Sequence, residues 1–407
     1  MTDLPLLSPE GVMSSTPLAE APAFARPTAA LRTRVAYAAA HVVPKPHADN
    51  TPGRPAEIDW DATLAFRRHV YGWGLGVADA MDTAQRNMGL DAEATRELIA
   101  RSAEVAREEG GSVVVGVNTD HVDAERLTRA EVIDAYVAQL HFTEEQGAGP
   151  VLMASRHLAR VAETADDYRR VYRAVLREAT TPVVLHWLGT AFDPQLEGYF
   201  GSTDWRAAAD VLLEIIGENP DRIAGVKMSL LNAESEVSVR ERLPESVRMF
   251  TGDDFNYVGL IGGDALPPAD AAGSTPDAAG SASGAARGHS DALLGAFAAI
   301  TPVASAAIQA LDAGDPEGYL RILGPTEDLS RQVFAAPTFY YKTGVAFLSW
   351  LNGHQSAFQM VGGLHSARSL PHLSRIVELA NASQALERPE LAAARWSDLL
   401  RLNGLLP

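Results

Sequence analysis

The chain contains no cysteine among its 407 residues. This absence excludes a disulfide framework, thiolate chemistry and a zinc site built from sulfur ligands. Positive charge is also scarce, since 34 basic residues face 52 acidic ones and the formal net charge is −18. Because such a surface repels phosphate backbones and anionic lipid headgroups, we expect no nucleic-acid partner and no membrane association.

The sequence also lacks a recognisable export or membrane segment. Asp3 and Glu10 lie near the N-terminus, where no basic start precedes an apolar run, so a secretory signal is not predicted. The most apolar stretch, residues 292–311, is interrupted by Pro302 and by polar residues such as Gln309. This composition predicts buried helices or a strand leading into a helix, rather than a membrane span. The expected location is the cytoplasm.

Lysine is nearly absent, with Lys45, Lys227 and Lys342 standing against 31 arginines. Arginine replaces lysine wherever a positive charge suffices, but it cannot supply a primary amine that loses its proton and attacks a carbonyl. Lys227 ends the short apolar run 223–228, which is typical of a buried strand. Codon bias also explains why lysine is rare, and Lys227 is then an ordinary ion-paired side chain. The catalytic and the structural interpretation of Lys227 both stay open at this point.

Short apolar runs alternate with long amphipathic segments from residue 31 onward, a pattern typical of βα units around a parallel sheet. No Gly-x-Gly-x-x-Gly turn follows a first strand, which disfavours a dinucleotide-binding sheet. Eight strands of this spacing predict an α/β fold of the (β/α)8 TIM-barrel type. The expected strands are residues 34–43, 74–79, 112–117, 150–154, 182–186, 223–228, 247–251 and 258–261. The clearest helices are residues 92–109, 128–146, 165–177 and 205–216.

Composition divides the chain into parts around this barrel. Residues 1–30 are rich in Pro, Ala, Ser and Thr and are expected to form a flexible N-terminal arm. The barrel is assigned to residues 31–312, with a low-complexity insert at 264–289 that has the composition of a flexible loop. Residues 313–407 are expected to form a C-terminal helical extension.

Polar and ionisable residues follow nearly every expected strand, and in a TIM barrel these ends form the active-site mouth. A purely structural barrel does not require this convergence. The candidates for holding a small-molecule substrate are Lys45, Asp79, Asp82, Thr83, Gln85, Asn118, Arg156 and Asp253.

A divalent-metal site is an alternative use of the same strand ends, with Asp79, Asp82 and Asp120 joined by His121 or His157. No His-x-His or His-Glu-x-x-His spacing marks such a site, so no metal ligand is assigned. The histidines of the extension are expected to be structural: His354, His365 and His372.

Lys227 and His186 lie on adjacent expected strands. A lysine buried in an apolar barrel loses basicity and forms an imine with a ketone, and the imine allows a neighbouring carbon–carbon bond to break or form. His186 has the ordinary pKa suited to the accompanying proton transfer. The residues therefore predict a catalytic pair that needs no cofactor beyond the imine.

These segments resemble the dihydrodipicolinate synthase and N-acetylneuraminate lyase superfamily of class I aldolases, in particular a divergent branch of unknown function. Ala-Gly-Val-Lys at 224–227 is similar to the Gly-x-Lys of the family's sixth strand, whose lysine forms the Schiff base. Thr-Gly-Asp-Asp at 251–254 is similar to its seventh-strand turn, and residues 182–186 to the fifth strand that ends in its catalytic tyrosine. Val-Pro at 43–44 is similar to the family's Thr-Pro opening.

The resemblance implies a TIM-barrel lyase, either an aldolase or a dehydratase, that assembles as a homo-oligomer (dimer or tetramer). His186 stands at the family's tyrosine position, and residues 79–85 replace its carboxylate-binding loop with an aspartate-rich segment. This replacement favours a sugar-like keto compound of carbohydrate metabolism as the substrate, and a 2-oxo acid like those of the family is the other candidate. The alternatives are a metal-dependent sugar isomerase or epimerase and a non-catalytic sugar-binding barrel.

Overall fold

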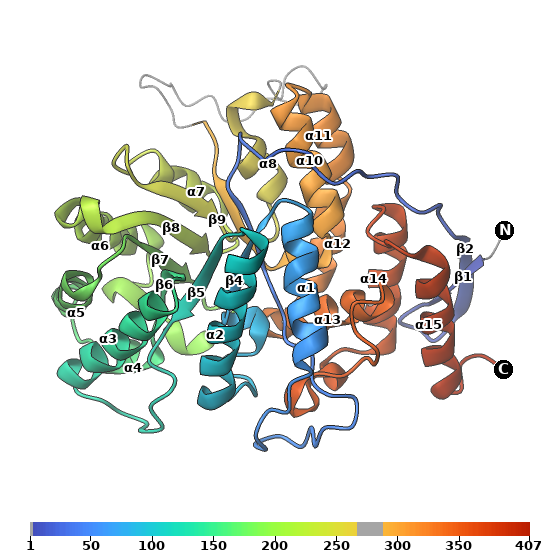
Figure 1. Cartoon of the computed structure of the whole chain (residues 1–407), viewed down its shortest axis with the longest axis horizontal. Coiled ribbons are helices and arrows are strands. Elements are labelled where there is room, and N and C mark those ends of the chain that lie inside the picture. The colour runs from blue at the N-terminus through green and yellow to red at the C-terminus, as the bar shows by residue number, and fades with distance from the viewer. Residues whose placement is uncertain (1–2, 267–287) are drawn as a thin grey trace.

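The computed structural model describes residues 3–266 and 288–407, and eight parallel strands form a closed barrel, which lies toward the left in Figure 1. The strands pair in the order β10-β3-β4-β5-β6-β7-β8-β9, and β10 closes the ring by pairing with both β9 and β3. The expected TIM-barrel fold with a C-terminal helical region is therefore confirmed. The barrel strands are β3 (Ala36–Ala39), β4 (Gly76–Asp79), β5 (Val113–Val117), β6 (Gly149–Met153), β7 (Val183–Leu188), β8 (Ile223–Ser229), β9 (Arg248–Thr251) and β10 (Asp291–Leu294).

Side chains of alternate strand residues point into the barrel and out to the surrounding helices. The interior is filled by an apolar cluster that includes Val184 and Phe250, whereas Val226 and Met228 pack outside with the helices. Lys227 is in register with Phe250, so it shares the inward face of β8 with Gly225 and Ser229.

Helices follow the strands and cover the barrel, and their ends carry strong local signals. Asp91 caps the start of α2 and Gly110, with φ of 62°, ends it. Thr128 and Glu131 form a capping box at the start of α3. The helices around the barrel are α1 (Trp60–Gly72), α2 (Ala92–Glu109), α3 (Arg129–Glu145), α4 (Arg156–Val161), α5 (Ala165–Glu178), α6 (Trp205–Glu218), α7 (Ala233–Arg240), α8 (Tyr257–Gly262), α9 (Ala296–Ala299) and α10 (Thr301–Asp312). The four clearest sequence-based helices correspond to α2, α3, α5 and α6.

The eighth strand differs from the one expected from sequence. Residues 258–261 belong to α8, and the strand that closes the barrel is β10, at the start of the apolar stretch for which buried helices or a strand leading into a helix were predicted. Both stretches are short and apolar, and at this length periodicity cannot distinguish a buried strand from a helix turn. Ala292 pairs with Ala36 of β3 and with Thr251 of β9, and this pairing identifies β10 as the eighth barrel strand.

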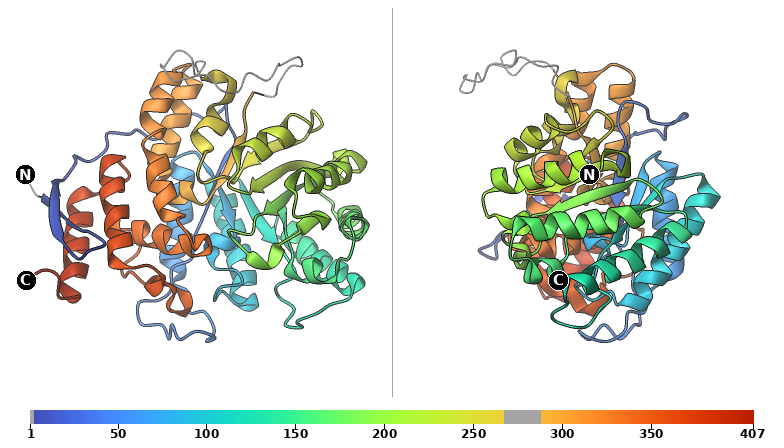
Figure 2. Two further views of the ribbon diagram at one scale, coloured as in Figure 1. Left: turned by 180° about the vertical axis from the view of Figure 1, so that it is seen from behind. Right: turned by 90° about the vertical axis from the view of Figure 1, so that its left-hand side faces the viewer.

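The C-terminal helices pack on one side of the barrel and also hold the N-terminal residues (Figures 1 and 2). Residues 3–17 form an antiparallel hairpin of β1 (Asp3–Leu7) and β2 (Met13–Pro17) against α14 and α15. Leu4 is fully buried, and Nε1 of Trp396 donates to the carbonyl of Pro5. Residues 3–17 therefore pack against the extension, whereas a flexible arm was expected over residues 1–30. The extension consists of α11 (Pro316–Leu323), α12 (Thr326–Val333), α13 (Tyr341–Leu351), α14 (Leu370–Ala382) and α15 (Pro389–Leu402).

Most of the low-complexity insert expected at 264–289 falls on residues 267–287, which lie outside the described residues. Across the part of the chain that is described, none of the helices has the length and apolarity needed to span a bilayer.

Candidate active site

Lys227 lies on the inward face of β8 and is 7% exposed. Burial lowers its pKa from the ordinary 10.5 to about 8, and the nearby carboxylates of Asp82 and Asp254 oppose that decrease. The sixth strand of the barrel therefore delivers a primary amine of unusually low basicity to its C-terminal half.

The seventh strand leaves room for this amine because Gly252 has no side chain. A Cβ atom at Gly252 would lie 2.8 Å from Cε of Lys227 and 2.2 Å from Oγ of Ser229. The Thr-Gly-Asp-Asp segment thus has a steric reason for its glycine: the lysine occupies the volume that any other residue would fill.

Two carboxylates face the lysine without contacting it closely. Asp254 is buried, and its Oδ1 accepts a hydrogen bond of 2.9 Å from the amide of Ala296. Burial raises the pKa of Asp254 to about 8, against the opposing effects of that hydrogen bond and of Lys227. Asp82, at the start of the 3-10 turn Asp82–Ala84, is half-buried, and desolvation raises its pKa although Lys342 and Lys227 lower it. Asp82 has no hydrogen-bond partner for its carboxylate among the described residues.

A second buried lysine reaches the same region from the C-terminal extension. Lys342, in the first turn of α13, is 2% exposed, and its Nζ lies 3.1 Å from Sδ of Met88. Burial lowers its pKa to about 8, opposed by Asp82 and Asp193. Asp82 therefore lies in the field of two amines, and two of the three lysines of the chain belong to one electrostatic cluster. Lys342 thus belongs to the electrostatic surroundings of the barrel mouth although it lies in the extension.

Thr83 and Tyr341 connect the second strand to the extension. Their hydroxyl oxygens lie 2.7 Å apart, and both side chains are buried. The ring of Tyr341 stacks on Phe334 with centroids 4.3 Å apart. Burial raises the pKa of the Tyr341 hydroxyl well above its usual range, and the carboxylates of Asp82 and Asp254 raise it further. This hydroxyl pair is neutral and hydrogen-bonded, as a proton relay requires.

His186 lies beside Lys227, in register with it on β7. Its Nε2 is 3.1 Å from Oγ of Ser229, and its Nδ1 is buried with no partner in the described part of the chain. Burial, assisted by the charge of Lys227, lowers the pKa of His186 well below 6.5. The imidazole is therefore neutral near pH 7 and poorly suited to donate a proton, which weakens the role predicted for it.

Asp79 does not face the barrel mouth. Its two carboxylate oxygens accept from Nε and Nη2 of Arg67 at 2.9 and 2.8 Å, and both side chains are fully buried. The preceding Ala78 faces the interior, so alternation turns Asp79 toward α1. The prediction that Asp79 binds substrate is therefore wrong: its carboxylate joins β4 to a helix.

Three other predicted residues are engaged elsewhere. The amide of Gln85 bonds the backbone of Val361 through both its oxygen, at 3.1 Å, and its nitrogen, at 2.8 Å. Asp253 caps a turn, accepting from the amide of Phe255 at 2.9 Å. Lys45 is exposed and lies 3.9 Å from Glu57. The three side chains thus have partners of their own in the described structure, and their binding of substrate stays a prediction.

Asn118 and Arg156 remain at the mouth, where they line the same hollow of about 300 Å³. Arg156 is partly exposed, and its Nε donates to Asp193 at 2.6 Å. Thr119 and His157 line the hollow too, and their side chains bond each other at 2.8 Å. A larger hollow of about 620 Å³ opens at the other end of the barrel, where the residues at the N-terminal ends of the strands line it.

The residues required for a metal site at the mouth do not converge. Arg86 binds the Asp120 carboxylate through both Nε and Nη2, and Gln139 contacts Nδ1 of His121 at 2.8 Å. Within the described ranges, the one group of three His and carboxylate side chains with ligand atoms close together lies elsewhere.

Sequence reasoning missed Asp254, Lys342 and Tyr341. Asp254 directly follows Asp253, which was predicted to bind substrate. The course of the backbone after β9 makes Asp253 the turn cap and Asp254 the carboxylate that acts on Lys227. The rarity of lysine was a usable signal for Lys342. For Tyr341 the sequence held no signal, because its partner Thr83 is 258 positions away.

A closed barrel of eight parallel strands defines a TIM-barrel protein, and its sixth strand carries a buried lysine in its C-terminal half. The chain belongs to the family described as "Protein of unknown function (DUF993)", which matches residues 4–405. No curated protein matches the sequence.

Several solved structures share the fold. The dihydrodipicolinate synthase of Aquifex aeolicus is 15% identical with a TM-score of 0.57, covering 91% of this chain and 98% of that one. The 4-hydroxy-tetrahydrodipicolinate synthase of Methylacidiphilum fumariolicum SolV is 15% identical with a TM-score of 0.58, and the match covers 92% of this chain and 99% of that one. A putative dihydrodipicolinate synthetase of Pseudomonas aeruginosa is 16% identical with a TM-score of 0.58, and the match covers 84% of this chain and 99% of that one. The resemblance to this superfamily is confirmed for the fold, and the family match agrees with a divergent branch of unknown function.

Proposed function

We propose that this protein is a lyase that acts on a carbonyl compound through a Schiff base on Lys227. The observation that carries the proposal is a buried amine whose pKa is lowered to about 8 at the end of the sixth strand. At pH 7 such an amine is unprotonated in about a tenth of the molecules, compared with about 0.03% for an ordinary lysine. Burial thus raises the reactive population by about two orders of magnitude, since only the unprotonated amine attacks a carbonyl.

In the proposed reaction, Nζ of Lys227 attacks the substrate carbonyl, and the carbinolamine loses water to give a protonated imine. The bond between the carbon next to the imine and the following hydroxyl-bearing carbon then breaks, and its electron pair forms an enamine. The hydroxyl proton passes to a base as the departing fragment becomes a carbonyl compound. Protonation of the enamine and hydrolysis release the second product and restore the amine.

Asp254 and the Thr83–Tyr341 pair are the groups best suited to move these protons. With a pKa of about 8, Asp254 carries its proton near neutral pH and can assist the loss of water from the carbinolamine. The Thr83–Tyr341 pair is neutral, so it takes up the substrate's hydroxyl proton only as it passes its own proton on, and the Asp82 carboxylate is the proposed final acceptor. The proposal therefore moves the relay from His186 to these residues. A dehydratase that expels a hydroxyl group from the enamine as water would use the same set.

The substrate class follows from the charges at the mouth. Asp82 offers a carboxylate to substrate hydroxyl groups, whereas Lys342 offers a buried cation to a carboxylate. Arg156 and Asp193 neutralise each other. With Asp79 turned away, the aspartate-rich loop repels anions less than its sequence suggests. We therefore propose a sugar-like keto compound or a 2-oxo acid. Assembly as a homo-oligomer and a cytoplasmic location stay predictions.

Reductive trapping tests the proposal. The full chain is incubated with a panel of keto sugars and 2-oxo acids, reduced with borohydride and digested for mass spectrometry. We expect one substrate to add its mass, less one oxygen atom, to the peptide that contains Lys227. Lys227→Arg keeps the charge and should abolish the adduct, whereas the matched variant Lys342→Arg should retain it.

Two outcomes would contradict the imine mechanism. If no compound gives an adduct while a chelator abolishes turnover, the metal-dependent isomerase is correct. If compounds bind without adduct or turnover, the barrel is a sugar-binding protein. An adduct on Lys342 in place of Lys227 would move the catalytic amine to the extension.

A further inference from the structure

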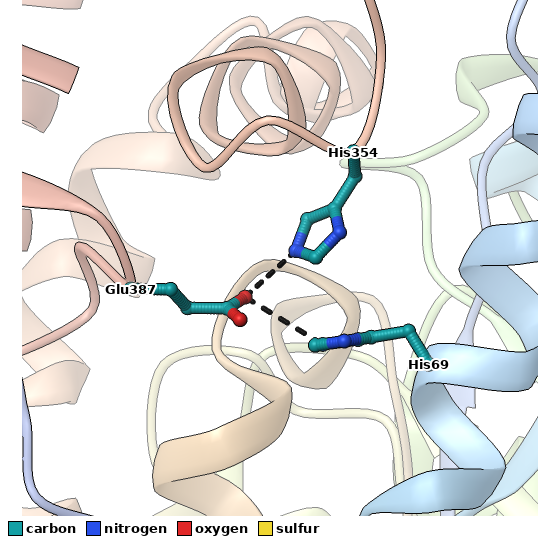
Figure 3. Close-up of side chains that lie close together, drawn as sticks. All are labelled: His69, His354 and Glu387. Carbon is teal, nitrogen blue, oxygen red and sulfur yellow. Dashed lines mark hydrogen bonds and ion pairs between the residues drawn. The ribbon is translucent and has the colours of Figure 1, made fainter. Parts of the chain in front are cut away.

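Two histidines and a glutamate from distant parts of the chain meet beside α1, outside the barrel (Figure 3). His69 lies in the last turn of α1, His354 follows α13, and Glu387 precedes α15. One ring nitrogen of each histidine and one carboxylate oxygen lie within 4.8 Å of one another, and within the described ranges this is the only such group. None of the three takes part in the lysine chemistry proposed above.

The separations of these atoms approach those around a tetrahedral metal ion. Ligand atoms at about 2.0–2.1 Å from zinc stand about 3.3–3.5 Å apart in a tetrahedron. Nε2 of His69 lies 3.5 Å from Oε1 of Glu387, and Nε2 of His354 lies 2.7 Å from the same oxygen. Of these two separations from the carboxylate oxygen, the first matches the tetrahedral value and the second must widen by about 0.7 Å.

The Nε2 atom of His69 is unsatisfied in the described part of the chain, because it is buried and makes no hydrogen bond. Buried polar atoms without a partner are rare in folded proteins, and such an atom often marks a place where an ion or a water molecule binds. Figure 3 shows both imidazole rings directed at the carboxylate, and Nε2 of His69 approaches Glu387 at ion-pair distance without a hydrogen bond.

Packing holds the rings in place. Phe66, which is 2% exposed, has its ring centroid 5.9 Å from that of His69 and 5.4 Å from that of His354. Glu387 also lines an open hollow of about 720 Å³, together with residues 18–21 and 388–391. The cluster therefore has a rigid apolar floor and a path from solvent.

We propose that His69, His354 and Glu387 bind a divalent transition-metal ion, with zinc the best match. Two imidazoles and one carboxylate form a common three-residue donor set for zinc, and a water molecule completes the tetrahedron. The ion would join the first helix of the barrel to two segments of the C-terminal extension. It would therefore stabilise the packing of the extension, on which Tyr341 and Lys342 depend for their position.

Metal titration of the untagged full chain tests this site. After chelator treatment and dialysis, zinc is added in competition with a chromogenic chelator, and cobalt(II) is added in a parallel experiment. We expect one equivalent of zinc bound with a dissociation constant of micromolar or below, a tetrahedral cobalt absorption band and a higher midpoint of thermal unfolding. His69→Gln and His354→Gln should each weaken zinc binding at least tenfold.

His372→Gln is the matched control, because His372 is half-buried in the same extension but contacts Gln332. It should bind zinc like the unmodified chain. The proposal is overturned if the unmodified chain binds no stoichiometric zinc, or if folded His69→Gln binds it equally well. Should both histidine variants fail to fold by circular dichroism, the cobalt spectrum decides: a weak octahedral spectrum overturns the site, and the cluster is then an ion pair alone.

Discussion

The hydroxyl oxygens of Thr83 and Tyr341 lie 2.7 Å apart, although 258 positions separate them in the chain. Thr83 follows the second barrel strand, whereas Tyr341 is the first residue of α13. The contact brings the C-terminal extension to the barrel mouth, where Asp82 and Asp254 both act on the tyrosine. The extension is thus part of the candidate active site and not a separate appendage.

Removing the Tyr341 hydroxyl should slow turnover without unfolding the protein. In Tyr341→Phe the ring still stacks on Phe334, so the loss of stability should stay within about 1–3 kcal/mol, the cost of leaving the buried Thr83 hydroxyl without its partner. Loss of a proton relay should reduce kcat by about 10²–10⁴-fold. Steady-state kinetics with the trapped substrate and thermal unfolding measure the two effects.

Tyr340→Phe is the control for this substitution, since Tyr340 is adjacent but partly exposed. It should leave kcat unchanged. An unchanged kcat in Tyr341→Phe would remove the tyrosine from the mechanism and return the relay to His186.

The rate of reductive trapping should increase with pH around a midpoint near 8. Burial lowers the pKa of Lys227 to about 8, and below that pH the amine carries a proton and has no lone pair for attack. Asp82 favours the charged amine, so Asp82→Asn should shift the midpoint to lower pH. Asp253→Asn serves as the control, because Asp253 caps a turn instead. A rate that is flat from pH 6 to 10 would contradict the assignment.

Adding one methyl group at Gly252 should disable the lysine. The new Cβ would lie 2.2 Å from Oγ of Ser229 and 2.8 Å from Cε of Lys227, so the amine must move. Misplacing a reacting atom by about 1 Å can cost about 10²-fold in rate. We expect Gly252→Ala to lose adduct formation by that factor. Gly259→Ala has open space around its new Cβ and should form the adduct normally, whereas an equal loss in both variants would point to a general folding defect.

The Arg67–Asp79 pair should matter for stability. Arg67→Met leaves the buried Asp79 carboxylate without its bidentate partner, which should lower the free energy of unfolding by about 3–5 kcal/mol. The exposed pair of Arg68 and Glu108 supplies the comparison, and Glu108→Gln should cost less than about 1 kcal/mol. Urea unfolding measures both values. A loss of substrate binding in stable Asp79→Asn, with unfolding unaffected, would instead restore Asp79 to the substrate site.

Strands one to seven were predictable because each is a short apolar run bounded by turn residues and followed by an amphipathic helix. The eighth was not, since β10 has four residues and the competing run at 258–261 is equally apolar. The N-terminal hairpin was also missed. Its residues have the composition of a loose segment, and they are ordered through contacts such as that of Pro5 with Trp396.

The candidate site also contains some residues that the sequence predicted and others that it did not. Lys227 could be identified because arginine otherwise dominates the basic residues and because a strand delivers its side chain to the barrel mouth. Asp79 was chosen wrongly since alternation within a four-residue strand turns it to α1. Tyr341 and Lys342 come from a helix whose docking no local pattern specifies.

The amino-acid sequence by itself determined the barrel class, most of its strands and the lysine at its sixth strand, because these follow from local periodicity and from the chemistry of single residues. Only the tertiary structure decided which carboxylates face that lysine, that a second lysine and a tyrosine join them, and that His69 meets His354 and Glu387. The physical reason is that burial and long-range packing determine which side chains meet and how far their pKa values shift, and burial and packing exist only in the folded chain.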